Sequence, residues 1–136
     1  MSSIKTMNNL PEDQLTLLVE QLRNYRIGEW NARQGMKQDF RCAYCDTDFL
    51  ACFNNYNSWV WDHIIPRSLD GEDTFENIVI CCRPCNFLKH AYLPSGSTRD
   101  ERIADARRYV QQLRVQNEEE VVSIRNLVRP ADAGSK

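Results

Sequence analysis

The spacing of hydrophobic residues predicts helical segments at both ends of the chain and a strand-containing segment between them. In the N-terminal segment, residues 10–37, leucine and valine recur every three to four positions after Pro11, as in an amphipathic helix. Gly28 interrupts this pattern, so residues 30–37 form either a second helix or a continuation of the first.

The middle segment, residues 38–93, has the character of short strands followed by a helix. Residues 58–65 are rich in aromatic and β-branched side chains and predict a strand that ends at a proline. The apolar run 78–81 predicts a second strand, and the residues after it predict a helix that ends near Pro94.

The C-terminal segment, residues 98–129, begins with a capping box at residues 98–101. One face of the predicted helix then carries apolar side chains suited to packing. An acidic run at 118–120 separates this helix from a further short helix predicted around residues 121–128, and residues 131–136 are predicted to be a disordered tail.

Composition supports one α+β domain spanning residues 1–136. The chain has 136 residues, of which 42% are hydrophobic and 26% charged, as in ordinary globular proteins. It shows neither a secretory signal nor an apolar run of membrane-spanning length, so we expect a cytoplasmic protein. A net charge of −2 argues against binding nucleic acid through a bulk positive field.

Four of the six cysteines lie in two C-x2-C motifs separated by 36 residues. The motifs consist of Cys42 with Cys45 and Cys82 with Cys85. In a reducing compartment, this pattern favours a structural zinc site with four thiolates over disulfides. Cys52 and Cys81 are interpreted as ordinary packing residues, although Cys81 is an alternative to Cys82 as a ligand.

A second set of residues carries a family resemblance. The stretch 62–71, then Asn77, then the stretch 82–89 resembles the HNH endonucleases, also called ββα-metal or His-Me finger nucleases, and the resemblance covers residues 37–90. The family's three signature positions fall on His63, Asn77 and Asn86. The chain departs from the family pattern in two loops, with Asp70 before Gly71 and a long segment before Asp62.

The resemblance implies a ββα-metal core stapled by the four-cysteine zinc and flanked by N- and C-terminal helices. It implies that His63 is the general base and that Asn77 orders the loop and this histidine. Asp62 and Asn86 supply oxygen ligands that suit Mg²⁺ or Mn²⁺. On a strand, Asp62 and His63 point to opposite sides and so act on different partners.

Three further side chains are candidates for contact with the nucleic acid: Arg67, Lys89 and His90. Arg67 and Lys89 are otherwise exposed charges. His90 lies one helical turn after Asn86, and it is a phosphate contact, a further metal ligand or a solvated histidine at a helix C-terminus.

The distribution of charge along the chain affects how tightly the protein is expected to bind nucleic acid. Residues 42–98 carry a net charge of −4, whereas the flanking segments 21–41 and 99–114 carry +3 and +2. The arginines of the flanking segments either contact a nucleic-acid backbone or simply lie on solvent-exposed helix faces. We therefore expect an endonuclease with weak intrinsic affinity for DNA, positioned by its flanking helices, a partner protein or a homodimer. The alternatives are a catalytically inactive, zinc-stabilised nucleic-acid-binding or adaptor module, and the same site acting on RNA.

Overall fold

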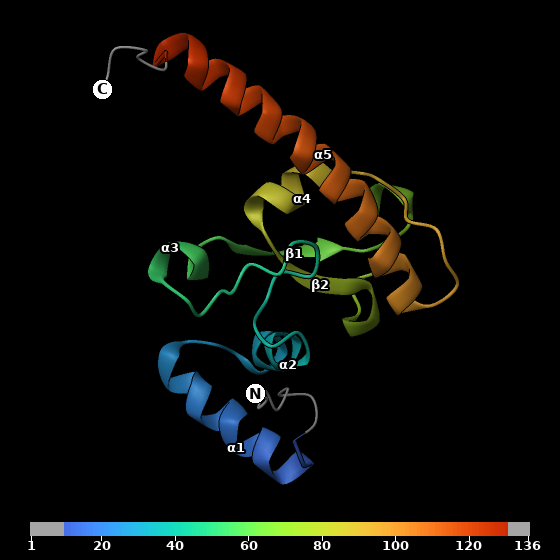
Figure 1. Cartoon of the computed structure of the whole chain (residues 1–136). Helices are drawn as coiled ribbons and strands as arrows, with labels where there is room; N and C mark the ends of the chain where they lie inside the picture. Colours follow the sequence, from blue (N-terminus) through green and yellow to red (C-terminus); the bar gives the residue numbers. More distant parts are fainter. Residues whose placement is uncertain (1–9, 131–136) are drawn as a thin grey trace.

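The computed structural model describes residues 10–130 and consists of a two-stranded sheet surrounded by helices (Figure 1). The elements in chain order are α1 (Glu12–Leu22), α2 (Glu29–Lys37), α3 (Phe53–Tyr56), β1 (Trp59–His63), β2 (Ile78–Cys82), α4 (Arg83–Lys89) and α5 (Arg99–Val128). This arrangement confirms the predicted α+β class with flanking helices. The predicted tail lies outside the described residues. Within residues 10–130, no helix is long and apolar enough to span a membrane.

The sheet is an antiparallel pair in which Trp59 lies opposite Cys82 and His63 lies opposite Ile78. All five residues of β2 are buried. On the free edge of β2, the side-chain amide of Gln38 takes the place of a third strand. It accepts from the backbone N of Ile80 and donates to the carbonyl of Ile80, both at 2.8 Å. The loop that follows α2 is thereby fixed beside the sheet.

The C-terminal segment is one helix of 30 residues rather than the two helices predicted from the acidic run. The side chain of Thr98 accepts from the backbone N of Glu101 at 3.1 Å, which confirms the predicted cap. Glutamate favours helices, and the stretch contains neither glycine nor proline, so nothing at residues 118–120 ends the helix. The helix therefore continues to Val128.

The buried residues form two clusters. The larger one joins the sheet to the first half of α5 through residues such as Val79, Ile80 and Val110. The smaller one lies between α1 and α2, which are separate helices rather than one. Trp59 packs against both clusters, so β1 connects the N-terminal helices to the rest of the core.

Candidate metal centre and active site

The two cysteine motifs come together at one end of the sheet. The Sγ atoms of Cys42, Cys45, Cys82 and Cys85 all lie within 4.8 Å of one another, and those of Cys45 and Cys82 are 3.6 Å apart. A tetrahedral zinc ion with bonds of about 2.3 Å needs sulfur atoms about 3.8 Å apart. The four cysteines are therefore positioned to hold a metal ion such as zinc. Cys81 is buried outside this group, in agreement with its interpretation as a packing residue.

Hydrogen-bond donors surround the sulfur atoms. The backbone N–H groups of Tyr44 and Cys82 each donate to Cys42 Sγ at 3.3 Å, and the guanidinium of Arg114 donates to Cys85 Sγ at 3.5 Å. Hydrogen bonding with the Cys42 thiol lowers the pKa of Cys82 to about 7 and also lowers the pKa of Cys45. The same sulfur–sulfur contacts raise the pKa of Cys42 and of Cys85, so two of the thiols ionise readily and a bound cation is needed to ionise all four.

Helix α5 clamps the first cysteine motif from outside. Arg107 donates to the carbonyl of Ala43 at 3.0 Å and pairs with Asp46, and Gln111 donates to the carbonyl of Tyr44 at 2.7 Å. Arg107 thus binds groups of the protein itself. It neither waits to contact a nucleic-acid backbone nor stands as a solvated charge, the two roles predicted for the flanking arginines. The sequence did not reveal this role, because it depends on which helix face meets the motif.

The Asp62 carboxylate lies inside the molecule, between β1 and α4, with 4% of the residue exposed. Its Oδ2 accepts from the Tyr44 hydroxyl at 2.6 Å and pairs with Lys89 Nζ at 3.1 Å, while Asn86 Nδ2 approaches Oδ1 at 3.2 Å. Burial raises the pKa of Asp62, and the Lys89 charge and the Tyr44 hydroxyl oppose that rise. Burial also raises the pKa of Tyr44, which keeps its hydroxyl protonated as a donor.

The placement of Lys89 corrects the prediction that it contacts phosphate at the surface. The residue is 0% exposed, and its Nζ lies 3.1 Å from Asp62 Oδ2 and 2.9 Å from the carbonyl oxygen of His63. A lysine enclosed in this way cannot reach a phosphate on the surface. Its charge instead balances the buried carboxylate.

His63 follows Asp62 on β1 and projects from the other side of the strand, with 19% of its side chain exposed. Its Nε2 lies 2.6 Å from Asp73 Oδ1, and this hydrogen bond lowers the pKa of Asp73. The sequence did not single out Asp73, because Asp70 and Glu72 stand in the same acidic loop and look equally suitable.

Asn77 closes the loop that follows β1. Its Oδ1 accepts from the backbone N of Ile65 at 2.9 Å, and its Nδ2 donates to the carbonyls of Ile65 and Glu72 at 3.0 Å each. Asp70 takes a left-handed conformation with φ of 70°, which aspartate tolerates better than most residues. A Cβ on Gly71 would lie 1.6 Å from the carbonyl oxygen of Ile65, so this tight closure requires glycine.

The remaining candidates lie at the surface. Asn86 lines a hollow together with Phe87 and His90, and His90 is exposed at the C-terminus of α4. Arg67 is exposed, and its guanidinium lies 3.9 Å from Asp73 Oδ2. The structure thus brings Asn86 against Asp62, and it places Arg67 near the carboxylate that contacts His63.

Comparison with known protein families agrees with this arrangement. The family model described as HNH endonuclease matches residues 42–92, which run from the first cysteine motif to just beyond α4. The match confirms, for this segment, the resemblance inferred from the sequence. No curated protein and no solved structure was found to match the chain.

The cysteine geometry predicts that metal binding depends on Cys82 and not on Cys81. We expect Cys82→Ser to lose most of its bound metal on dialysis, because a hydroxyl replaces one of four thiolates. Cys81→Ala should retain as much metal as the wild type, and so should Cys52→Ser at an exposed position. Metal content measured by plasma emission spectroscopy checks this. Loss from Cys81→Ala together with retention by Cys82→Ser would contradict the assignment.

Proposed function

We propose that the protein is a cytoplasmic, metal-dependent HNH endonuclease that hydrolyses phosphodiester bonds in DNA. The observation that carries this proposal is the contact between Asp62 on β1 and Asn86 on α4, at 3.2 Å, beside a histidine with a carboxylate partner. The match of residues 42–92 to the HNH endonuclease model supports the same reaction class. The acidic segment 42–98 suits weak binding to DNA that depends on metal loading.

Asp62 and Asn86 are the proposed ligands of a catalytic Mg²⁺ or Mn²⁺. Tyr44 and Lys89 both contact Oδ2 of Asp62, so Oδ1 is the oxygen that faces Asn86. Rotation of the Asn86 amide about its last side-chain bond turns its own oxygen toward the same space. Two protein oxygens suit a hard cation that keeps its other positions for water and phosphate. When bound, the cation neutralises charge on the phosphate and lowers the pKa of coordinated water.

His63 is the proposed general base. The 2.6 Å contact with Asp73 supports a tautomer in which Nε2 carries the proton, leaving Nδ1 to accept a proton from the attacking water. Asp73 is therefore a positioning residue that fixes the orientation of the imidazole. Asn77 holds both ends of the loop that carries Asp73, since it bonds the backbone at Ile65 and at Glu72.

The four-cysteine centre is proposed to bind Zn²⁺ in a structural role, because the four thiolates would fill all four positions of the ion and leave none for water or substrate. Arg67 and His90 are the proposed phosphate contacts. Both are exposed, and His90 borders the same hollow as Asn86. Cleavage is expected to leave 5′-phosphate and 3′-hydroxyl ends.

The proposal predicts plasmid cleavage that requires Mg²⁺ or Mn²⁺ and His63. We expect His63→Ala to reduce the cleavage rate by about 10²–10⁴-fold, the usual contribution of a general base. Asn86→Ala should reduce it as well and raise the Mg²⁺ concentration needed for half-maximal activity. Asn126→Ala, the same change at an exposed position of α5, should cleave at the wild-type rate. Rates are measured by gel analysis of supercoiled, nicked and linear forms.

Two outcomes of this experiment would overturn the proposal. Equal rates for wild type and His63→Ala would exclude His63 as the base. An inactive wild type that still binds DNA under all metals tested would favour a binding or adaptor module. A parallel panel of single- and double-stranded DNA and RNA identifies the nucleic acid that is cleaved, and faster cleavage of RNA would replace DNA as the substrate.

The contact between His63 and Asp73 predicts an intermediate loss of activity in Asp73→Asn. The amide keeps the shape but removes the charge that fixes the tautomer, so we expect kcat to fall by about tenfold or more with little change in KM. The pH dependence of kcat should also change, which a purely structural role would not produce. Glu72→Gln, a matched change in the same loop, provides the control. Equal pH profiles for Asp73→Asn and wild type would contradict a positioning role.

A further inference from the structure

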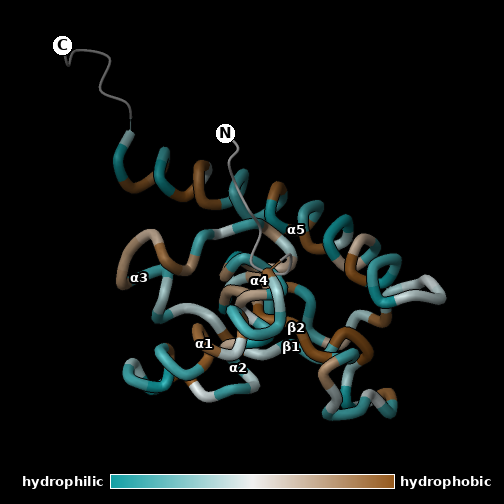
Figure 2. Tube along the Cα trace, turned by 90° about the horizontal axis from the view of Figure 1, so that it is seen from below, coloured by the Kyte–Doolittle hydropathy of each residue, from teal (hydrophilic) through white to brown (hydrophobic). Residues whose placement is uncertain are grey.

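The second half of α5 extends away from the rest of the molecule (Figure 1). Every residue from 115 to 128 is exposed, including apolar side chains that normally seek burial. In Figure 2 the hydrophobic positions recur along the full length of α5, beyond the part that packs on the sheet. The exposed apolar residues of this half are Val115, Val121, Val122, Ile124, Leu127 and Val128.

Part of this apolar set continues the face by which α5 packs on the core. From the buried Val110, positions 114, 117, 121, 124 and 128 follow at alternating intervals of four and three residues. This interval is the seam of a left-handed pair of helices. The last three seam positions are Val121, Ile124 and Val128, so the most apolar part of the seam is the part that the core leaves uncovered.

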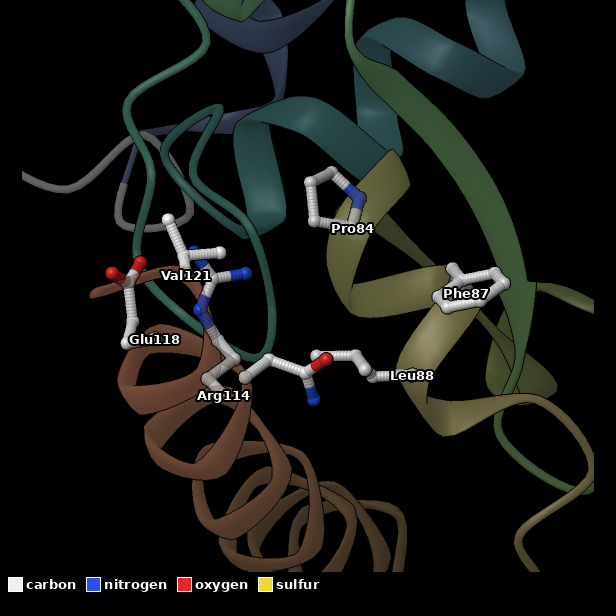
Figure 3. A pocket seen from close by; sticks show the side chains of 7 residues that line it. Pro84, Phe87, Leu88, Arg114, Glu118 and Val121 are labelled. Atoms are coloured by element: carbon white, nitrogen blue, oxygen red, sulfur yellow. The ribbon is translucent and has the colours of Figure 1, made fainter. Parts of the chain in front are cut away.

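A groove adjoins the start of this exposed seam. Figure 3 shows Pro84, Phe87 and Leu88 on the α4 side, facing Arg114, Glu118 and Val121 on α5. Phe87 lies at the edge of this groove and is 79% exposed. The groove meets the apolar part of the seam at Val121, with the polar side chains of Arg114, Asn117 and Glu118 along its α5 side. We call the groove and the exposed seam together the α4–α5 surface.

The acidic charge of the free half of α5 limits which kind of partner can cover the α4–α5 surface. The free half of the helix carries three glutamates at 118–120 against one arginine, Arg125. This acidic balance repels nucleic-acid phosphates and anionic lipid, both of which are recognised by clustered Lys and Arg. The surface therefore suits a helix from a protein, with an apolar seam and a complementary charge pattern.

The free half of α5 is complementary to itself in the antiparallel direction. A register that pairs Val121 with Ile124 of a second copy also pairs Ile124 with Val121, because the two-fold axis repeats every contact. In this register Glu118 lies beside Arg125 of the other copy, which gives two attractive pairs. The apolar end of the second helix, at Leu127 and Val128, then reaches the groove beside Phe87.

The position of the core favours antiparallel over parallel pairing of the two α5 helices. The first half of the seam is covered by the core at Val110, and α4 packs beside it. A parallel partner would bring its own core to the same level and the same side, where the two would collide. An antiparallel partner places the two cores at opposite ends of the helix pair.

We propose that a second copy of this chain covers the α4–α5 surface, forming a two-fold dimer through antiparallel pairing of the C-terminal halves of α5. The surface involved is small, so the dimer forms at micromolar concentrations rather than at nanomolar ones. The proposal rests on α4 and α5 alone and does not depend on nuclease activity.

Sedimentation velocity of the full metal-loaded chain, over about 1 to 200 µM, tests the dimer. The wild type should pass from monomer to dimer across this range. Ile124→Glu places a charge in the seam and should raise the dimer Kd at least tenfold. Val122→Glu, the same change one helical step away from the seam on the same exposed stretch, should leave the Kd within about twofold of wild type.

A charge exchange tests the direction of pairing. Glu118→Arg should weaken the dimer several-fold, and the double variant Glu118→Arg with Arg125→Glu should restore it. Glu120→Arg should have little effect, because a parallel pair would place Glu120, and not Glu118, beside Arg125. Circular dichroism and metal content confirm that each variant is folded. A wild type that stays monomeric throughout, or a dimer insensitive to Ile124→Glu, overturns the proposal.

Discussion

The convergence of four cysteine sulfur atoms on one point is the constraint on which the rest of the structure depends. One pair comes from the loop after α2, and the other spans the junction of β2 and α4. The strands have five residues each, and a two-stranded sheet of that length is barely stable alone in water. A metal bound by the four thiolates would fix the loop, the strand and the helix together. Because the second motif lies where β2 becomes α4, the same ion would set the direction in which α4 leaves the sheet.

That direction decides which side chains of α4 reach Asp62. Asn86 and Lys89 lie on α4 within two turns of the second motif, and both contact Asp62. Burying a carboxylate and an ammonium costs free energy that their mutual attraction only partly offsets. This cost is explained if the ion pair serves to orient the Asp62 carboxylate. Tyr44 and Lys89 hold one of its oxygens, and the other oxygen then points at Asn86. Helix α5 supports this geometry from outside, because Arg107 and Gln111 hold the backbone of the first motif.

Local patterns in the sequence predicted much of this arrangement. The spacing of the cysteines predicted the four-sulfur group, the apolar runs predicted both strands, and the capping box at Thr98 predicted the start of α5. These features depend on neighbouring residues, so they can be inferred without knowledge of the tertiary structure. The spacing favoured Cys82 but left Cys81 as an alternative ligand, and the positions of the sulfur atoms favour Cys82.

The features that the sequence did not predict depend on contacts between distant segments. Lys89 is a residue type usually found at the surface, and its burial results from an ion pair with a residue on β1. Asp73 differs from its acidic neighbours only in where the loop places it relative to His63. The continuity of α5 was missed for a different reason. A run of like charges was interpreted as a break, although helix propensity at glutamate favours continuation when no glycine or proline intervenes.

The central claim is that the metal centre holds β1, β2 and α4 in the geometry that brings Asn86 to Asp62. Hydrogen exchange measured by mass spectrometry, on the metal-loaded chain and after chelation, tests it most directly. We predict that chelation removes amide protection from β1, β2 and α4, while α1 and α2 lose less because their cluster lies on the far side of Trp59. Unchanged protection of α4 and β2 after complete metal removal would contradict the account.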